Sequence, residues 1–114
     1  MTLLLNRDAV AKAEELIKAG KVVLDERAGW KDVEPTTTEE NEFIRLNGLE
    51  AYSRWHLGID DEKAEGTKAR YEFPYGDFKN VFRSGLLAAE SRAGQYKHPD
   101  IEGATKQLLS MLGK

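Results

Sequence analysis

The chain has 114 residues, of which 40% are hydrophobic and 32% are charged, a composition typical of a folded domain and unlike that of a disordered chain. It contains no cysteine, which excludes disulfides, thiolate metal ligands and a thiol nucleophile and favours a cytoplasmic location. The net charge of -3 is unevenly distributed: residues 1–67 contain nine Lys or Arg and fifteen Asp or Glu, whereas residues 68–98 contain six and three. A basic segment of this size is typical of a solvated surface, and it also suits a phosphate or an acidic partner.

The sequence carries no export or membrane signal. Its N-terminal run Met-Thr-Leu-Leu-Leu is shorter than the apolar region of a signal peptide. No stretch approaches the roughly 18 apolar residues that a membrane-spanning helix requires. We therefore expect one domain over residues 1–114, without a membrane partner.

The first predicted element is an amphipathic helix over residues 7–19. Asn6 precedes it as the expected N-cap, and apolar residues recur along it at helical spacing. Three of these residues are expected to face the core: Val10, Ala13 and Ile17. Residues 21–24 then suit a short extended segment, and residues 25–35 suit a connection that Trp30 attaches to the edge of the core.

The run TTTEE predicts the start of a second helix, because it contains two overlapping capping boxes in which a hydroxyl and a carboxylate each accept a backbone amide hydrogen. The first would pair Thr36 with Glu39, and the second would pair Thr37 with Glu40. Three apolar residues are expected to point inward: Phe43, Leu46 and Leu49. The pair Asn47–Gly48 favours a turn, so we expect an interruption there.

Two segments, residues 55–59 and residues 71–75, alternate large apolar residues with smaller or polar ones, as short half-buried strands do. The polar segment between them, residues 60–70, suits the loop of a β-hairpin. Pro74 has no backbone N–H and restricts the second strand to an edge or to its own end. Because an isolated hairpin is only marginally stable, its apolar face is expected to pack on helices.

The clearest helical pattern covers residues 78–95, with Asp77 as the expected N-cap. Pro99 occupies a favoured first helical position and opens a last helix. These two helices are expected to form a C-terminal helical hairpin. Its core would contain Phe82, Leu86, Ala89, Ile101, Ala104 and Leu108, with Trp55 and Phe73 beneath them. Together the elements predict an α+β fold that is rich in helix, with about four helices and one short β-hairpin.

The chain lacks a recognisable catalytic or metal-binding motif. Its two histidines, His56 and His98, are not spaced to place metal ligands on one helix face, and the run Asp60-Asp61-Glu62 lacks the spaced ligands of a calcium loop. None of its serines lies in a Gly-x-Ser-x-Gly elbow. We therefore expect no metal, no cofactor and no catalytic residue.

The densest cluster of unusual residues combines aromatic rings with cations. It contains Trp55, Tyr71, Phe73, Tyr75 and Phe78, flanked by Arg70, Lys79 and Arg83. Rings between cations suit a surface on which single-stranded nucleic acid stacks its bases. The same rings are also what a core of this size requires, and packing is the favoured interpretation.

Residues 52–112 resemble a small family of uncharacterised bacterial proteins. The resemblance depends on three runs: WHLGID, RYEFPYGDF and LLAAESRAGQYKHPDIEGATKQLL. More distantly, the Phe-Pro strand and the two following helices are similar to a module appended to phage prohead-protease and related capsid-gene polypeptides. The matching positions are Tyr71, Phe73, Pro74, Asp77, Leu86, Ala88, Ala89, Arg92, Gln95, Ile101, Ala104 and Leu108. None of them is a known catalytic residue, so the resemblance implies a fold and not protease activity.

The favoured function is that of a small non-enzymatic binding or adaptor protein of bacterial or prophage origin, with a protein partner. The alternative is a nucleic-acid-binding accessory protein or a small enzyme. The candidate binding residues are Trp55, His56, Tyr75, Arg83, Arg92, Gln95, Lys97 and His98. Arg92 and Gln95 lie three residues apart and should share one helix face. Cations near the end of a helix also favour its dipole, which is the structural alternative to binding.

Overall fold

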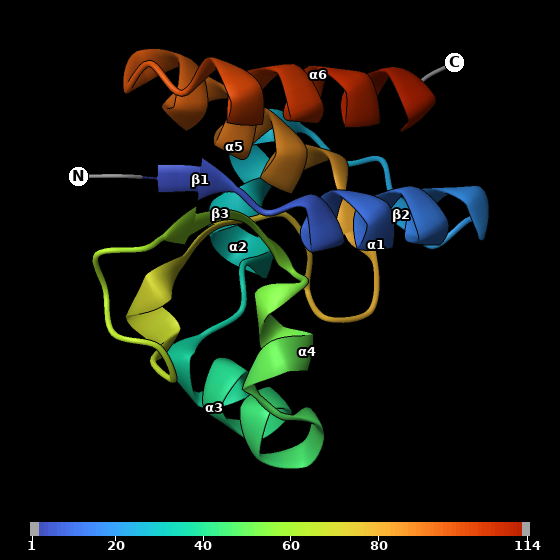
Figure 1. Cartoon of the computed structure of the whole chain (residues 1–114). Coiled ribbons are helices and arrows are strands. Elements are labelled where there is room, and N and C mark those ends of the chain that lie inside the picture. Colours follow the sequence, from blue (N-terminus) through green and yellow to red (C-terminus); the bar gives the residue numbers. More distant parts are fainter. Residues whose placement is uncertain (1–2, 113–114) are drawn as a thin grey trace.

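The computed structural model describes residues 3–112 and has the predicted α+β fold (Figure 1). This part of the chain contains six α-helices, two more than the sequence pattern predicts. The helices are α1 (Arg7–Lys18), α2 (Trp30–Val33), α3 (Thr37–Asn47), α4 (Leu49–Ser53), α5 (Arg83–Gln95) and α6 (Pro99–Leu112). The strands are β1 (Leu3–Leu5), β2 (Val22–Val23), β3 (His56–Asp60), β4 (Tyr71–Pro74) and β5 (Val81–Phe82). The additional helices, α2 and α4, are too short to produce a clear apolar period.

The sheet contains the predicted hairpin and one further strand. β3 and β4 pair antiparallel, with Gly58 opposite Glu72. β1 pairs antiparallel with the other edge of β3, with Leu4 opposite Ile59, so β3 is the central strand. Helices α5 and α6 lie on one side of this sheet, and α3 and α4 lie on the other (Figure 1). Three residues are too few to show strand alternation, which is why the sequence pattern does not reveal β1.

Helix α1 forms as predicted, but the Asn6 side chain that precedes it makes hydrogen bonds other than the expected capping bond. Asn6 is the N-cap residue, as predicted, but its side chain makes no capping hydrogen bond. Its Nδ2 atom donates instead to the carbonyl oxygens of Ser53 (2.9 Å) and His56 (3.0 Å), which connects the start of α1 to the start of β3. The buried residues of α1 are Ala9, Ala13 and Leu16, whereas Val10 and Ile17 are half-buried.

Helix α3 begins with the first of the two predicted capping boxes. Thr36 Oγ1 accepts from the Glu39 amide (3.2 Å), and Glu39 Oε1 accepts from the Thr36 amide (2.9 Å). The helix ends where expected, at Gly48, whose φ of 92° suits glycine. The prediction that Leu46 faces the core is wrong: its exposed fraction is 64%, and no residue of α3 is buried.

Helix α5 begins at Arg83, later than predicted. Asp77 Oδ1 accepts hydrogen bonds from the amides of Lys79 (3.0 Å) and Asn80 (2.8 Å), and these bonds close a turn. The chain then extends into β5, which pairs in parallel with β2. The prediction that Asp77 caps this helix is therefore wrong, because the β2–β5 pair separates the turn from the helix.

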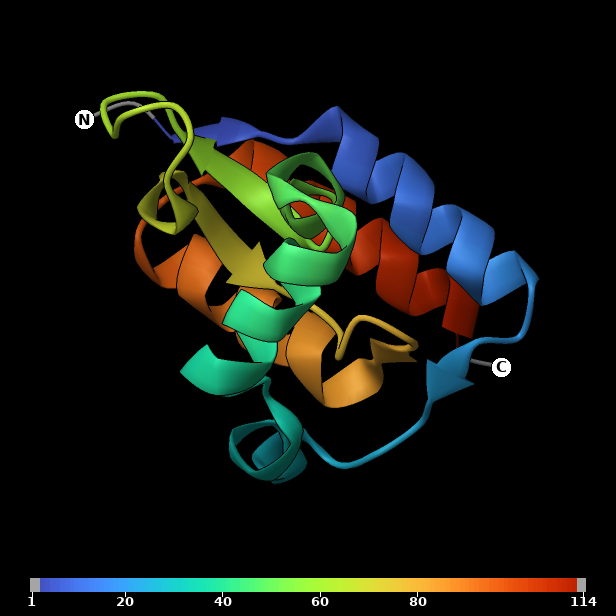
Figure 2. The same cartoon turned by 90° about the horizontal axis from the view of Figure 1, so that it is seen from below.

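Helices α5 and α6 form the predicted helical hairpin, and Figures 1 and 2 show α1 running alongside α6. The fully buried leucines and isoleucine of this hairpin are Leu86, Ile101 and Leu108. Ala104, which was expected in the core, is half-buried, and Thr105 is buried in its place. No helix within residues 3–112 has the length and apolar character that crossing a membrane requires.

Candidate functional site

Three residues predicted for a binding face are buried. The exposed fractions of Trp55, His56 and Tyr75 are 4%, 3% and 0%. The rings of Trp55 and Tyr75 stack with their centroids 5.4 Å apart, and Tyr75 Oη donates to the carbonyl oxygen of Arg54 (2.8 Å). These rings belong to the core, as the favoured interpretation of the aromatic cluster expects, and they are not available for base stacking.

His56 is a buried imidazole without the surroundings of a catalytic base. Its Nδ1 atom lies 2.9 Å from the carbonyl oxygen of Tyr52, and since a carbonyl only accepts, the ring carries its hydrogen on Nδ1. Burial lowers the pKa of His56 to about 4, so the ring is neutral at pH 7. Among the described residues, no three His, Asp or Glu side chains are placed to hold a metal ion.

The predicted residues near the end of α5 do come together. The guanidinium carbon of Arg92 lies 5.8 Å from the centroid of the Phe73 ring, and the His98 ring meets the same ring edge-on at 6.2 Å. Gln95 and Lys97 are exposed at this end of the helix. Arg92 therefore makes a cation–π contact that is purely intramolecular.

Arg83 lies at the other end of α5 and is half-buried. Its Nη1 atom donates to the carbonyl oxygen of Asp25 (3.3 Å), which is a structural contact. The predicted site residues are thus divided between the core and both ends of α5, and they do not line one concave surface.

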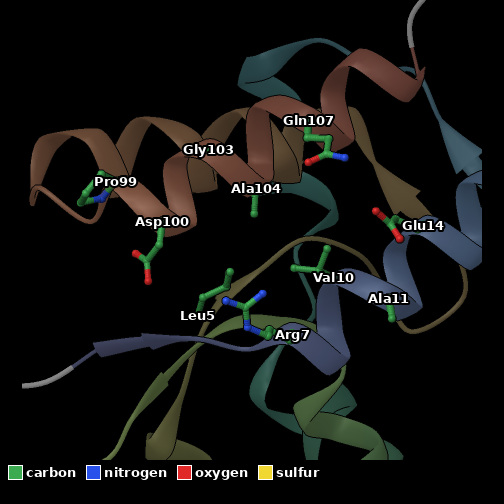
Figure 3. A pocket seen from close by; sticks show the side chains of 10 residues that line it. All are labelled: Leu5, Arg7, Val10, Ala11, Glu14, Pro99, Asp100, Gly103, Ala104 and Gln107. Atoms are coloured by element: carbon green, nitrogen blue, oxygen red, sulfur yellow. The ribbon is translucent and has the colours of Figure 1, made fainter.

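The first cavity lies between α1 and α6 and has a volume of about 450 Å³ (Figure 3). Leu5, Val10 and Ala104 contribute apolar atoms to its lining. Figure 3 shows Arg7 of α1 and Asp100 of α6 extending toward the space between the two helices. Because the lining carries both signs of charge on exposed side chains, this cavity selects neither an anion nor a cation.

A second cavity, of about 740 Å³, lies between α3 and the turn at residues 77–80, and we name it the α3 groove. Its floor contains Phe43 and Phe78, whose rings stack with centroids 4.3 Å apart and an interplanar angle of 11°. Leu46, with its large exposed fraction, lines the same groove. The α3 groove is therefore an open apolar surface, and α3, which forms part of its lining, has no buried residue.

The turn at residues 77–80 holds Phe78 in an unusual backbone conformation. Phe78 has a φ of 71°, in the left-handed region that bulky residues avoid, and the two hydrogen bonds to Asp77 stabilise this turn. The Phe78 ring also meets the buried ring of Trp55 edge-on at 5.8 Å. Backbone strain of this kind is found where a side chain must occupy one position, and here it places an aromatic ring in the groove.

The edge of the α3 groove is acidic. Three acidic residues, Glu39, Glu42 and Asp77, line it together with one cation, Lys79. A hydrogen bond from Arg45 lowers the pKa of Glu42, which is therefore ionised at neutral pH. The groove thus combines an apolar floor with a net negative edge.

A third cavity, of about 570 Å³, lies between α2 and the C-terminal half of α5, and we name it the Trp30 pocket. It is lined by Ala28, Trp30, Lys31, Ala88, Ser91 and Arg92. No Asp or Glu is among these lining residues, so its charge is opposite to that of the α3 groove.

No family model, curated protein or solved structure matches this chain.

The residues of the α3 groove were not among the candidate site residues. A signal was present in the sequence, because residues 37–47 contain only three apolar residues, Phe43, Ile44 and Leu46. So few apolar residues cannot bury a helix face of three turns. The sequence of this helix therefore indicates an exposed apolar stripe.

Proposed function

We propose that this protein is a small non-enzymatic binding or adaptor protein, of bacterial or prophage origin, whose α3 groove binds a basic amphipathic helix of a partner protein. The observation that carries this proposal is the apolar surface of α3, where Leu46 is 64% exposed and Phe43 is half-buried. Apolar side chains on one open helix face, next to an aromatic ring, are typical of surfaces that receive an amphipathic helix.

The length of the α3 groove supports a helical partner. Its lining on α3 extends from Thr38 to Asn47, which corresponds to about 14 Å along the helix axis. The apolar residues of a bound helix at positions i, i+4 and i+7 span about 10 Å. Two turns of a partner helix therefore fit along α3.

The charge of the groove supports a basic partner. Glu42 is already paired with Arg45, and the two other acidic residues at the edge, Glu39 and Asp77, outnumber the single cation of the lining, Lys79, so a helix with Lys or Arg beside its apolar stripe would be attracted. Because these charges are at the surface, the attraction should decrease as the salt concentration rises.

Two synthetic helical peptides test this proposal. Both carry Leu at positions i, i+4 and i+7; one has Lys and the other has Glu at the flanking positions, and each carries a fluorescein label. Fluorescence polarisation with the full chain should give an affinity for the Lys peptide about tenfold or more above that for the Glu peptide at low salt, with a smaller difference at high salt. Equal affinities at low salt would contradict the charge argument.

Matched variants locate the binding surface. Leu46→Gln should weaken binding of the Lys peptide by about tenfold, a typical loss for an apolar residue at the centre of an interface. Leu24 is exposed to a similar extent, 61% against 64%, and lies outside the α3 groove, so Leu24→Gln is the control and should leave the affinity unchanged. If both variants bind the Lys peptide equally well, the α3 groove is not the binding site.

A further inference from the structure

We propose that the Trp30 pocket binds a small aromatic carboxylate. This site is separate from the α3 groove, and it differs from that groove in the sign of its charge, in its length and in the residues that form its walls.

The walls of the Trp30 pocket are apolar and small. Ala28 and Ala88 line the pocket together with Trp30, whose exposed fraction is 8%, so only a small part of Trp30 reaches the pocket. The indole packs closely on Gly85 of α5, where a Cβ atom would approach Trp30 Cζ3 to 3.0 Å. A planar ring can pack against a fixed indole edge at little cost in side-chain entropy.

The charged groups of the pocket favour an anion. Lys31 and Arg92 both line it, one from α2 and one from α5. Neither side chain forms an ion pair in the described part of the chain, and the contact of Arg92 is with the face of the Phe73 ring. The N–H donors of Arg92 therefore remain available for a carboxylate, which a guanidinium binds through two parallel hydrogen bonds. The hydroxyl of Ser91 adds one further donor.

The length of the pocket favours a small molecule over a peptide. Its lining on α5 extends only from Ala88 to Arg92, about 6 Å along the helix axis. This distance is about one helical turn, which is too short for the apolar stripe of a bound helix. The volume of about 570 Å³ lies within the range of small-molecule sites, roughly 300–1,000 Å³.

Calorimetric titration of the full chain with 2-naphthoate tests the proposal, and 2-naphthylmethylammonium is the matched cationic probe. We expect saturable binding of naphthoate and an affinity for the cation that is lower by about tenfold or more, because each cation of the pocket changes from an attractive to a repulsive neighbour.

Variants separate charge from shape. Arg92→Gln and Lys31→Gln should each weaken naphthoate binding by about two- to fivefold, the usual effect of an exposed charge pair. Ala88→Leu and Ser91→Leu fill the pocket without changing its charge, and each should abolish binding. The control Lys18→Gln, which makes the same change of net charge on α1 and lies outside the lining, should bind normally.

Three results would overturn the proposal: no saturable binding of naphthoate, equal affinities for the two probes, or normal naphthoate binding by both filled variants. Circular dichroism of each variant shows whether it is folded, and since Ser91 is exposed, Ser91→Leu remains informative if Ala88→Leu fails to fold.

Discussion

The carboxylate of Asp25 accepts two hydrogen bonds from Ser84, a residue 59 positions further along the chain. One comes from the backbone amide (2.8 Å) and the other from the hydroxyl (2.6 Å). Because Ser84 lies in the first turn of α5, Asp25 performs the N-cap function that the sequence pattern assigned to Asp77. The cap of α5 thus comes from a distant segment.

This relationship gives the first prediction. Asp25→Ala should lower the free energy of unfolding by about 2 kcal/mol, because it leaves a buried amide and hydroxyl without an acceptor. Asp25→Asn keeps one acceptor oxygen and should have a smaller effect, and Asp32→Ala, at an exposed position on α2, should have almost none. Urea denaturation measures all three, and equal stability of Asp25→Ala and Asp32→Ala would show that the long-range cap contributes nothing.

The second prediction concerns pH. The pKa of His56 is about 4 in the folded chain and about 6.5 in the unfolded chain, so between these values only the unfolded chain binds the proton. The neutral ring therefore contributes its full share of the free energy of unfolding above pH 6.5. This contribution is lost as the pH falls toward 4, and the loss is at most about 3 kcal/mol. Comparing urea midpoints of the wild type and His56→Gln across this range isolates the effect. Parallel pH profiles would contradict it.

The third prediction tests the helical hairpin. Leu86 is fully buried between α5 and the remainder of the core, so Leu86→Ala should cost about 2–5 kcal/mol. Leu46→Ala, at a mostly exposed leucine, should cost less than about 0.5 kcal/mol. A loss below that limit for Leu86→Ala would mean that the assigned face of α5 is not buried.

The fourth prediction compares two glycines. A Cβ atom on Gly76 would lie 2.3 Å from the carbonyl oxygen of Asn80 and 2.6 Å from the Trp55 ring, whereas a Cβ atom on Gly103 would meet nothing within 4 Å. Gly76→Ala should therefore destabilise the protein by about 1–3 kcal/mol. Gly103→Ala, in the interior of α6, should stabilise it by up to about 1 kcal/mol. Thermal denaturation of both variants tests how tightly the turn after β4 is packed. An unchanged stability of Gly76→Ala would show that the turn has room for a Cβ atom.

Local patterns predicted much of the fold. The capping box of Thr36 and Glu39, the interruption at Gly48 and the start of α6 at Pro99 depend on residues close in sequence, and all three are confirmed. Asp77 shows where such patterns fail. Its carboxylate accepts amides two and three residues later, as in a helix N-cap, and the difference comes from Val81, whose amide donates to the distant Lys21 carbonyl (2.9 Å).

The candidate site was predicted less well, for a related reason. The alternation at residues 55–59 indicates a strand with one buried face, but β1 makes β3 the central strand, and the remaining structure covers both faces. His56 and Trp55 are therefore both buried, and their residue types alone did not indicate that they are. Arg92 remains on the surface. It lines the Trp30 pocket together with Trp30, a residue that is far from Arg92 in sequence.

The absence of buried residues in α3 also determines how this helix moves. A helix whose side chains are at most half-buried can detach at lower cost than the sheet and the α5–α6 hairpin, so its amide hydrogens should exchange with deuterium by local opening. A ligand that contacts both α3 and the turn at residues 77–80 would close this route. Slowed exchange confined to residues 37–47 would thus report occupancy of the groove directly, even for a partner that binds too weakly to be isolated.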